Sequence, residues 1–121
     1  MARVAYRVRP CRSSEELAQA WGAIGHYFGW VPSEEEVERF AKLLPAERTH
    51  AVFEGDDAVA GAGAFGFDMT VPGPVAIPCA GVTVVGTLPN HRRRGLLTRM
   101  MRAQLDDIRD RGEPIAALFG K

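Results

Sequence analysis

One stretch of the chain, residues 82–97, constrains its fold more than any other. It has the sequence VTVVGTLPNHRRRGLL, in which a β-branched run stops at Pro89, passes through a basic turn, and enters a helix at Gly95. This arrangement directs free backbone N–H groups and the positive end of a helix dipole at one point. Because Gly95 has no side chain, a ligand can approach the backbone there. The stretch therefore predicts a site for a phosphate or pyrophosphate.

The three consecutive arginines of this stretch admit a second interpretation. Their guanidinium groups can meet phosphate oxygens in paired hydrogen bonds, but three arginines before a helix are equally typical of a solvated turn. The surrounding order of strand, proline, loop, glycine and helix favours the phosphate site. We therefore predict anion binding that is local to this turn.

The composition limits the other classes of function. The chain has 121 residues, which corresponds to one domain, and 15 basic residues balance 15 acidic ones. This balance argues against nucleic acid as a partner, because nucleic-acid-binding domains carry a basic excess. No apolar run approaches the roughly 18 residues of a membrane span, and arginines interrupt the first residues, where a signal peptide would be apolar. We expect a cytoplasmic globular protein with no membrane partner.

The cysteines do not indicate a metal site. Cys11 and Cys79 are far apart in the sequence and lack the spacing of metal ligands. We predict two reduced, partly buried thiols and no bound metal.

The first 48 residues have the pattern of one strand and two helices. Residues 4–9 alternate apolar and basic residues, which is typical of a half-exposed strand. Ser13 and Glu16 have the spacing of a capping box at the start of a first helix, which Gly25 and Gly29 are predicted to break. A second helix is predicted to start after Ser33 and to close at residue 45. The apolar faces predicted for the two helices are Leu17, Ala20, Trp21 and Ile24 in the first and Val37, Phe40, Leu43 and Leu44 in the second.

From residue 49 the pattern changes to the period of two that strands have. We predict strands at residues 49–54, 58–69, 75–88 and 114–119, and a helix at 97–111 that ends at a left-handed Gly112. Alanines and glycines in residues 58–69 would let a helix or a ligand approach closely. The core-facing residues predicted for the helix are Leu97, Met100, Met101, Leu105 and Ile108.

The predicted order of elements is β-α-α-β-β-β-α-β. A right-handed crossover would lay residues 114–119 parallel to residues 82–88. The basic turn would then lie at the carboxyl end of a strand, where ligands bind in open α/β sheets.

Several motifs resemble the GNAT superfamily of N-acetyltransferases. Arg92, Gly95 and Leu97 stand at the three fixed positions of its signature, which is Q or R, two residues, G, one residue, and G or A. Leu97 departs from the small residue usual there, and the run HRRRGLL is similar to the Eis (enhanced intracellular survival) branch. Further matches are TVPG at residues 70–73, AGV at 80–82 and PIAAL at 114–118. The resemblance spans residues 49–118.

The resemblance implies an α/β fold (α+β by some schemes), the GNAT acyl-CoA N-acyltransferase fold, with a mixed sheet flanked by helices. The chain would be a single GNAT domain over residues 1–121, incomplete at its C-terminus after the fifth strand. Acetyl-CoA would be the co-substrate and would lie where two parallel strands splay apart. The implied contacts are made by backbone groups: those of Val85, Gly86 and Thr87 with the pantetheine arm and the acetyl carbonyl, and those of Arg93, Arg94, Gly95, Leu96, Leu97 and Thr98 with the pyrophosphate.

Two of these strand residues carry a further expectation. Gly86 suits a bulge that turns an N–H toward the thioester oxygen, as an oxyanion hole requires. Val85 is equally typical of an ordinary core strand, and both roles are compatible because the implied contact is made by its backbone.

The catalytic groups are expected beyond Lys121. The resemblance implies a proton-donating tyrosine shortly after the strand that ends near Leu118, and a base that is the C-terminal carboxylate of a longer chain. The tyrosines of this sequence, Tyr6 and Tyr27, lie far upstream. Histidines titrate in a useful range, but His91 beside the arginines is better suited to contact a phosphate or to cap the turn than to act in catalysis.

Two groups of N-terminal residues are candidates for an amine site. His26 lies in a run with Tyr27, Phe28 and Trp30, where the family builds one wall of its amine pocket; the remaining histidine is His50. Aromatic rings in that run would either hold a cation or pack between helices. The acidic run Glu34, Glu35 and Glu36 would either attract a polyamine or cap the second helix.

We therefore predict an acetyl-CoA-dependent N-acetyltransferase acting on a primary amine of the aminoglycoside, lysine or polyamine type, with this chain supplying the acetyl-CoA-binding part. Two other hypotheses stay open. One is a non-catalytic module that binds CoA or another phosphorylated ligand. The other is an assembly module, in which a free strand edge near residue 119 pairs with a second copy as a homo-oligomer.

Overall fold

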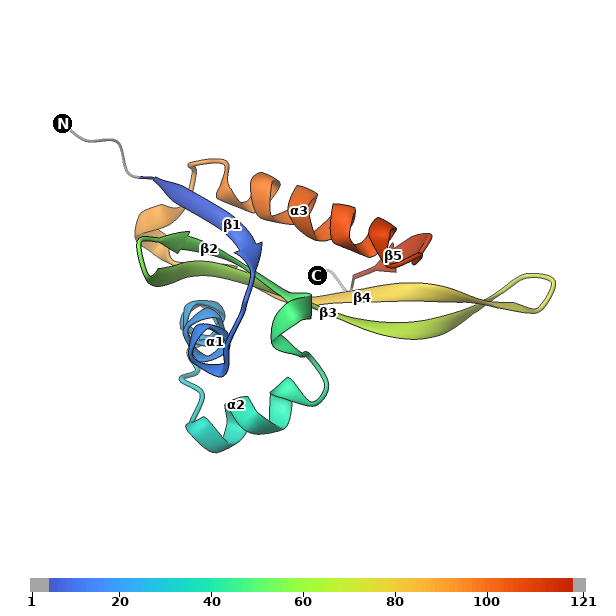
Figure 1. The fold of residues 1–121 in the computed structure, drawn as a ribbon, viewed down its shortest axis with the longest axis horizontal. Helices are drawn as coiled ribbons and strands as arrows, with labels where there is room; N and C mark the ends of the chain where they lie inside the picture. Colours follow the sequence, from blue (N-terminus) through green and yellow to red (C-terminus); the bar gives the residue numbers. More distant parts are fainter. Residues whose placement is uncertain (1–4, 119–121) are drawn as a thin grey trace.

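A five-stranded sheet with helices on both faces makes up residues 5–118, the part of the chain that the computed structural model describes (Figure 1). The strands lie in the order β1-β2-β3-β4-β5; β4 and β5 run parallel, and the other neighbours are antiparallel. The elements are β1 (Tyr6–Pro10), α1 (Ser14–Phe28), α2 (Glu34–Ala41), η1 (Ala46–Arg48), β2 (Thr49–Glu54), β3 (Asp57–Val71), β4 (Val75–Thr87), η2 (Pro89–His91), α3 (Leu96–Asp110) and β5 (Ile115–Ala117). The predicted order and the parallel last strand are confirmed. Residues 4 and 119 of the predicted terminal strands lie outside the described residues.

Helix α3 covers one face of the sheet and buries a different stripe from the predicted one. Its buried residues are Leu96, Met100, Gln104 and Ile108. Leu97 and Leu105, predicted to face the core, are 50% and 48% exposed. Gln104 is tolerated inside because its Nε2 donates to the Ala62 carbonyl oxygen at 3.1 Å. A prediction from apolar residues places Leu105 in the core in preference to Gln104. The predicted buried face is therefore displaced by one residue from the observed one.

Helices α1 and α2 cover the opposite face, and both begin after the predicted serines. The Ser13 hydroxyl accepts from the Glu16 N–H, and Ser33 forms a complete capping box with Glu36. The buried residues of this layer are Leu17, Trp21, Ile24, Val37 and Leu44. Leu43 was predicted in the same stripe but is 70% exposed, because α2 ends at Ala41 and Leu43 no longer follows the helical period.

An ion pair between Arg9 and Glu16 joins β1 to the first turn of α1. The two carboxylate oxygens of Glu16 accept from the Arg9 guanidinium at 2.8 and 2.6 Å, and one of them also accepts from the Arg12 N–H. The hydrogen bonds from Arg9 and from the Arg12 backbone lower the pKa of Glu16 to about 2. Glu16 thus binds Arg9 and Arg12 instead of completing the predicted box with Ser13.

The two glycines predicted to break α1 have different roles. Gly29 ends the helix in a left-handed conformation with a φ of 70°, as predicted. Gly25 lies within the helix, so the prediction of a break there was wrong. The Trp30 N–H donates to the Gly25 carbonyl at 2.8 Å, and a Cβ on Gly25 would clash with the Trp30 carbonyl oxygen. Gly25 is therefore needed where the chain folds back over the end of the helix.

Strands β3 and β4 continue past the rest of the sheet as a long two-stranded arm (Figure 1). Where β3 crosses the sheet, its small residues admit α1: a Cβ on Gly61 would lie 2.9 Å from Cδ1 of Ile24. Of the two alternatives that the sequence left open at these residues, a helix and not a ligand occupies the space beside Gly61.

The cysteines are free, as predicted, and both are fully buried. Burial raises the pKa of the Cys11 thiol to about 12, which leaves it protonated and unreactive at neutral pH. Within residues 5–118, no three side chains of the metal-ligating kinds come together. None of the helices in the same range has the length and apolar character needed to cross a membrane.

Candidate functional site

The edge of β4 is open beyond the point where β5 ends. β5 pairs with β4 at three positions, Cys79 with Ile115, Ala80 with Ala116 and Gly81 with Ala117. β4 continues for six more residues, to Thr87, and among residues 5–118 no strand pairs with that edge. Backbone groups on an unpaired strand edge are available to an extended ligand. The structure thus places a gap between two parallel strands next to the basic turn.

A bulge in β4 lies in the middle of this open edge. Gly61 pairs with Gly86 and Gly63 pairs with Thr83, so Val84 and Val85 together oppose one residue of β3. Val84 has a φ of 51°, which is unusual for a β-branched residue. Val84 packs with the α1–α2 layer and Val85 with the α3 layer. Val84 and Val85 face opposite layers, as adjacent residues of a strand do, and the bulge shifts the register of the residues that follow by one position.

The prediction of a bulge at Gly86 was wrong by one or two residues. Gly86 is regularly paired and faces α1, where a Cβ would lie 3.0 Å from Cα of Ile24. Glycine is needed at this position because the helix backbone touches the strand, and the preceding bulge sets which face residue 86 takes.

The turn after β4 presents the start of α3 to the same gap. Gly95 is the N-cap of α3 with a φ of 72°, and Arg93 also has a positive φ, 62°. No side chain among the described residues caps α3. The first N–H groups of the helix are therefore left for water or a ligand.

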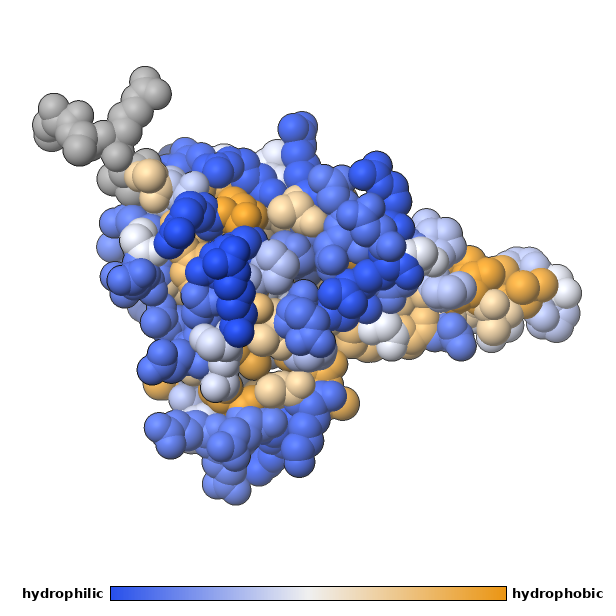
Figure 2. Space-filling view, in the orientation of Figure 1, coloured by the Kyte–Doolittle hydropathy of each residue, from blue (hydrophilic) through white to orange (hydrophobic). Residues whose placement is uncertain are grey.

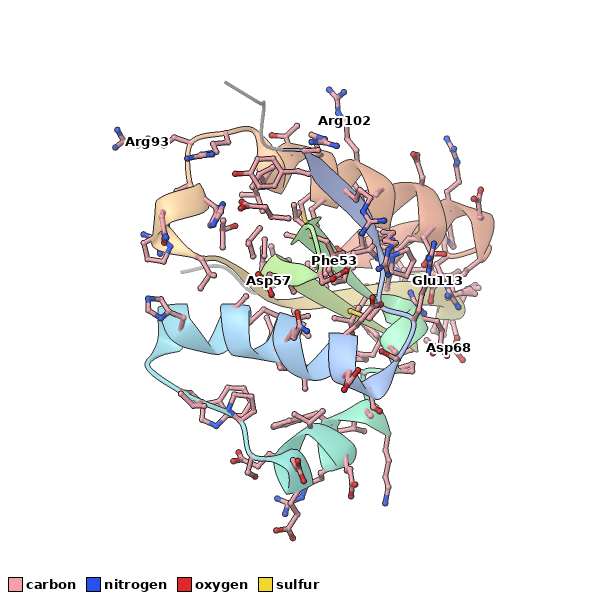
Figure 3. All side chains as sticks on the ribbon, turned by 60° about the vertical axis from the view of Figure 1, so that its left-hand side comes forward. Phe53, Asp57, Asp68, Arg93, Arg102 and Glu113 are labelled. Atoms are coloured by element: carbon pink, nitrogen blue, oxygen red, sulfur yellow. The ribbon has the colours of Figure 1, made fainter. Side chains whose placement is uncertain are left out.

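The strand end, the turn and the helix start enclose a pocket of about 380 Å³. The described residues that line it are Val85, Gly86, Thr87, His91, Arg92, Arg93, Gly95, Leu96, Leu97 and Thr98. The structure thus brings together every predicted site residue except Arg94, which is not part of this lining. Figure 3 shows Arg93 extending outward from the turn.

Arg94 instead extends to β1 and connects the turn to that strand. Its guanidinium donates to the Tyr6 hydroxyl at 2.8 Å, and that hydroxyl lies 2.9 Å from Nδ1 of His91. The rings of Tyr6 and His91 meet edge to face, and Glu54 lies 3.3 Å from the same His91 nitrogen. Arg99 donates to the Tyr6 carbonyl at 3.2 Å. Tyr6 therefore links three residues of the turn and helix to the far edge of the sheet.

Sequence reasoning missed this role of Tyr6. Nothing near Tyr6 in the sequence signals it, because its partners lie more than 80 residues away. His91, for which the sequence suggested a phosphate contact or a turn cap, lines the pocket and is held by Tyr6.

The other candidate residues do not line this pocket. His50 is buried in β2, and burial lowers its pKa, which favours the neutral form. His26 is exposed, and the side chains of Tyr27 and Phe28 lie outside the part of the chain that the structure describes. Trp30 stacks edge to face on Trp21 and donates its Nε1–H to Glu36 at 3.1 Å.

The acidic run lies in the first turn of α2 and takes part in capping that helix, which is one of the two roles predicted for it from the sequence. Glu36 completes the capping box with Ser33, and Glu34 and Glu35 are exposed in the first turn.

A family model of the acetyltransferase (GNAT) domain matches residues 7–121. The chain belongs to the GNAT acetyltransferase family. Members of this family transfer an acetyl group from acetyl-CoA. An N-acetyltransferase of Streptomyces avermitilis is 45% identical over 104 residues, which are 86% of this chain and 24% of that protein.

Solved structures agree with this assignment. The crystal structure of Eis1 from Mycobacterium abscessus matches with a TM-score of 0.79 and 32% identity, over 93% of this chain and 27% of that one. A GNAT acetyltransferase from Kribbella flavida matches with a TM-score of 0.83 and 28% identity, over 96% and 30% of the two chains. The predicted fold and the similarity to the Eis branch are confirmed. The chain spans about a quarter of the length of these relatives.

Proposed function

We propose that this chain binds acetyl-CoA along the open edge of β4 and at the start of α3, and holds it for acetyl transfer to a primary amine. The observation that carries the proposal is the coincidence of two features at one place. The edge of β4 is unpaired from Val82 to Thr87 among the described residues, and the uncapped first turn of α3 opens into the same pocket. An extended amide-bearing arm fits the first feature and a pyrophosphate fits the second.

Backbone groups supply most of the proposed contacts with the pyrophosphate. Gly95 leaves room for close approach, and the N–H groups of Leu96, Leu97 and Thr98 belong to the first turn of α3. Arg93 adds a positive charge at the rim of the pocket. Arg94 contributes by fastening the turn to Tyr6, which keeps the N–H groups in one arrangement.

The amine nitrogen forms a bond to the acyl carbon as the carbon–sulfur bond breaks; the amine loses one proton and the CoA sulfur gains one. The role that we propose for residues 82–98 is to bind and orient the thioester, with backbone N–H groups near the β4 bulge stabilising its oxygen. The acceptor amine that we propose is of the aminoglycoside, lysine or polyamine type.

Binding of acetyl-CoA by titration calorimetry tests the first half of the proposal. We expect Gly95→Asp to weaken binding at least tenfold, because it places a negative charge beside the pyrophosphate. We expect Arg94→Glu to weaken binding as well, because it removes the guanidinium that holds the turn to Tyr6. Arg102→Glu is the matched control for Arg94→Glu, since Arg102 projects from α3 on the side away from the sheet (Figure 3) and is exposed. Unchanged affinity in both site variants would refute the pyrophosphate assignment.

Release of free thiol tests the second half. The chain is incubated with acetyl-CoA and, in separate reactions, kanamycin, a lysine peptide and spermidine, and thiol is measured against time. Thiol release that depends on the amine supports transfer. Tight binding of acetyl-CoA without release from any amine would support the alternative, a module that binds CoA without catalysing transfer.

A further inference from the structure

A second and larger pocket adjoins the proposed cofactor site. It has a volume of about 680 Å³ and lies between the β3–β4 arm and the end of β5. Phe65, Phe67 and Met69 of β3 form one side, and Ala117 and Leu118 form another. Its floor is the stretch of β4 from residue 81 to residue 85, which includes the bulge.

The two pockets meet at Val85, which lines both of them. The smaller pocket is lined by the turn and the start of α3. The larger pocket begins at the bulge and continues toward the arm. A thioester whose phosphates lie at α3 and whose arm follows β4 would therefore deliver its acyl group into the larger pocket. The direction is set by the order of residues along β4.

The lining of the larger pocket is apolar. Among the described residues that form it none is charged, and Thr83 carries the one side-chain hydroxyl. The rings of Phe65 and Phe67 lie 5.6 Å apart between centroids, and these residues are 40% and 37% exposed. Figure 2 shows apolar residues gathered along the projecting arm. Exposed aromatic rings around a cavity are typical of a binding surface for an apolar group.

Gly81 gives the pocket its shape. A Cβ on Gly81 would lie 2.6 Å from the Phe65 ring, so the ring rests directly on the β4 backbone. Phe65, Phe67 and Met69 follow at every second residue on one face of β3, and they extend the lining for about 13 Å along the arm. An acetyl group has a single methyl and occupies a small part of such a cavity.

We propose that this pocket accepts the acyl group of the CoA thioester. The acyl donors then include medium-length thioesters, such as hexanoyl-CoA or octanoyl-CoA, as well as acetyl-CoA. The inference rests on the proposed function, because the pocket is reached from the acetyl-CoA site. The transfer step is unchanged: the bond from amine nitrogen to acyl carbon forms, the carbon–sulfur bond breaks, and one proton passes from the amine to the sulfur. Only the apolar tail differs.

A chain-length series measured by calorimetry tests the proposal without any catalysis. The ligands are CoA, acetyl-CoA, butyryl-CoA, hexanoyl-CoA and octanoyl-CoA. We expect affinity to rise about two- to fourfold for each methylene that becomes buried, so that hexanoyl-CoA binds at least tenfold more tightly than acetyl-CoA. Equal affinity across the series would overturn this inference and leave the proposed function intact. Failure of every ligand to bind would refute both.

Two substitutions locate the effect. Phe67→Asp places a carboxylate in the pocket and should abolish the gain with chain length while CoA itself binds as before. Val75→Asp is the matched control, because Val75 is exposed on the same arm and does not line the pocket. Leu118→Asp repeats the test from the other wall, at a position that is exposed. A gain with chain length that survives both pocket variants would place the acyl chain elsewhere.

Discussion

Gly86 is the residue at which α1 rests on β4, and its substitution probes both stability and the site. A methyl group introduced by Gly86→Ala would lie 3.0 Å from Cα of Ile24 and 3.3 Å from its carbonyl oxygen. Carbon atoms in contact prefer about 3.5–4.0 Å. The partner is helix backbone and cannot turn aside as a side chain would. Strand and helix must therefore separate, and such overpacking costs about 1–3 kcal/mol.

Gly22→Ala provides the matched control. Gly22 lies in the middle of the same helix, and apart from its chain neighbours and the adjacent backbone of the helix no described atom lies within 4 Å of the position that its Cβ would take. Alanine is favoured over glycine inside a helix by roughly 0.5–1 kcal/mol, so this variant should be more stable than the parent. The two variants add the same methyl group and should shift the free energy of unfolding in opposite directions.

Urea unfolding followed by circular dichroism measures both changes in the free energy of unfolding. In thermal unfolding, we expect Gly86→Ala to lower the melting temperature by about 4 °C for each kcal/mol lost in a chain of this size. It should also weaken acetyl-CoA binding, because Gly86 and its neighbours Val85 and Thr87 line the smaller pocket. If Gly86→Ala were as stable as the parent while Gly22→Ala was stabilised, the close contact between Gly86 and the backbone of Ile24 would be refuted.

Three further predictions concern polar contacts. Tyr6→Phe removes the hydroxyl that holds the basic turn and should weaken acetyl-CoA binding about fivefold, the equivalent of one net hydrogen bond, as measured by calorimetry. Arg48→Ala leaves the buried carboxylate of Glu113 without its partner and should cost about 3–5 kcal/mol in urea unfolding, most of which the double variant Arg48→Met, Glu113→Leu should restore. The hydrogen-bonded Arg9 guanidinium lowers the pKa of Glu16 to about 2, below its unfolded value of 4.5. The ionised Glu16 therefore contributes its full stabilisation above about pH 4.5 and loses it as the pH falls toward 2. Glu16→Gln should flatten this part of the profile of unfolding free energy against pH.

Each of these has an outcome that contradicts it. Equal affinity of the parent and Tyr6→Phe would mean that the turn keeps its shape without β1. A double variant at Arg48 and Glu113 no more stable than Arg48→Ala would show that the pair itself, and not the unpaired charge, matters. Parallel pH profiles of the parent and Glu16→Gln would place the acid-sensitive group elsewhere.

Caps and turns were predicted well because their chemistry involves neighbours in the sequence. Ser13 and Ser33 begin α1 and α2, and Gly29 and Gly112 take the left-handed conformation at the ends of α1 and α3. The basic turn was recognised for the same reason, since strand, proline and glycine lie within a few residues of one another. A local pattern suffices wherever a local hydrogen bond decides.

The errors lie where segments far apart in the sequence decide. Gln104 is buried because the Ala62 carbonyl is there to accept its hydrogen bond, and Leu105 is exposed as a result. Gly86 is regularly paired and contacts α1. The bulge two residues earlier determines that residue 86 faces that helix. Tyr6 binds Arg94 across the sheet, and no pattern near either residue indicates it.

Local sequence was enough for the order of the elements, the family motif and the position of the basic turn. Which backbone groups are free to bind was decided by the assembled sheet. β5 stops opposite Gly81, the edge of β4 lies open from Val82 to Thr87 among the described residues, and Phe65 settles on Gly81 to open an apolar cavity beside it. Strand register and burial depend on the summed contacts of distant segments, and those contacts exist only once the chain has folded.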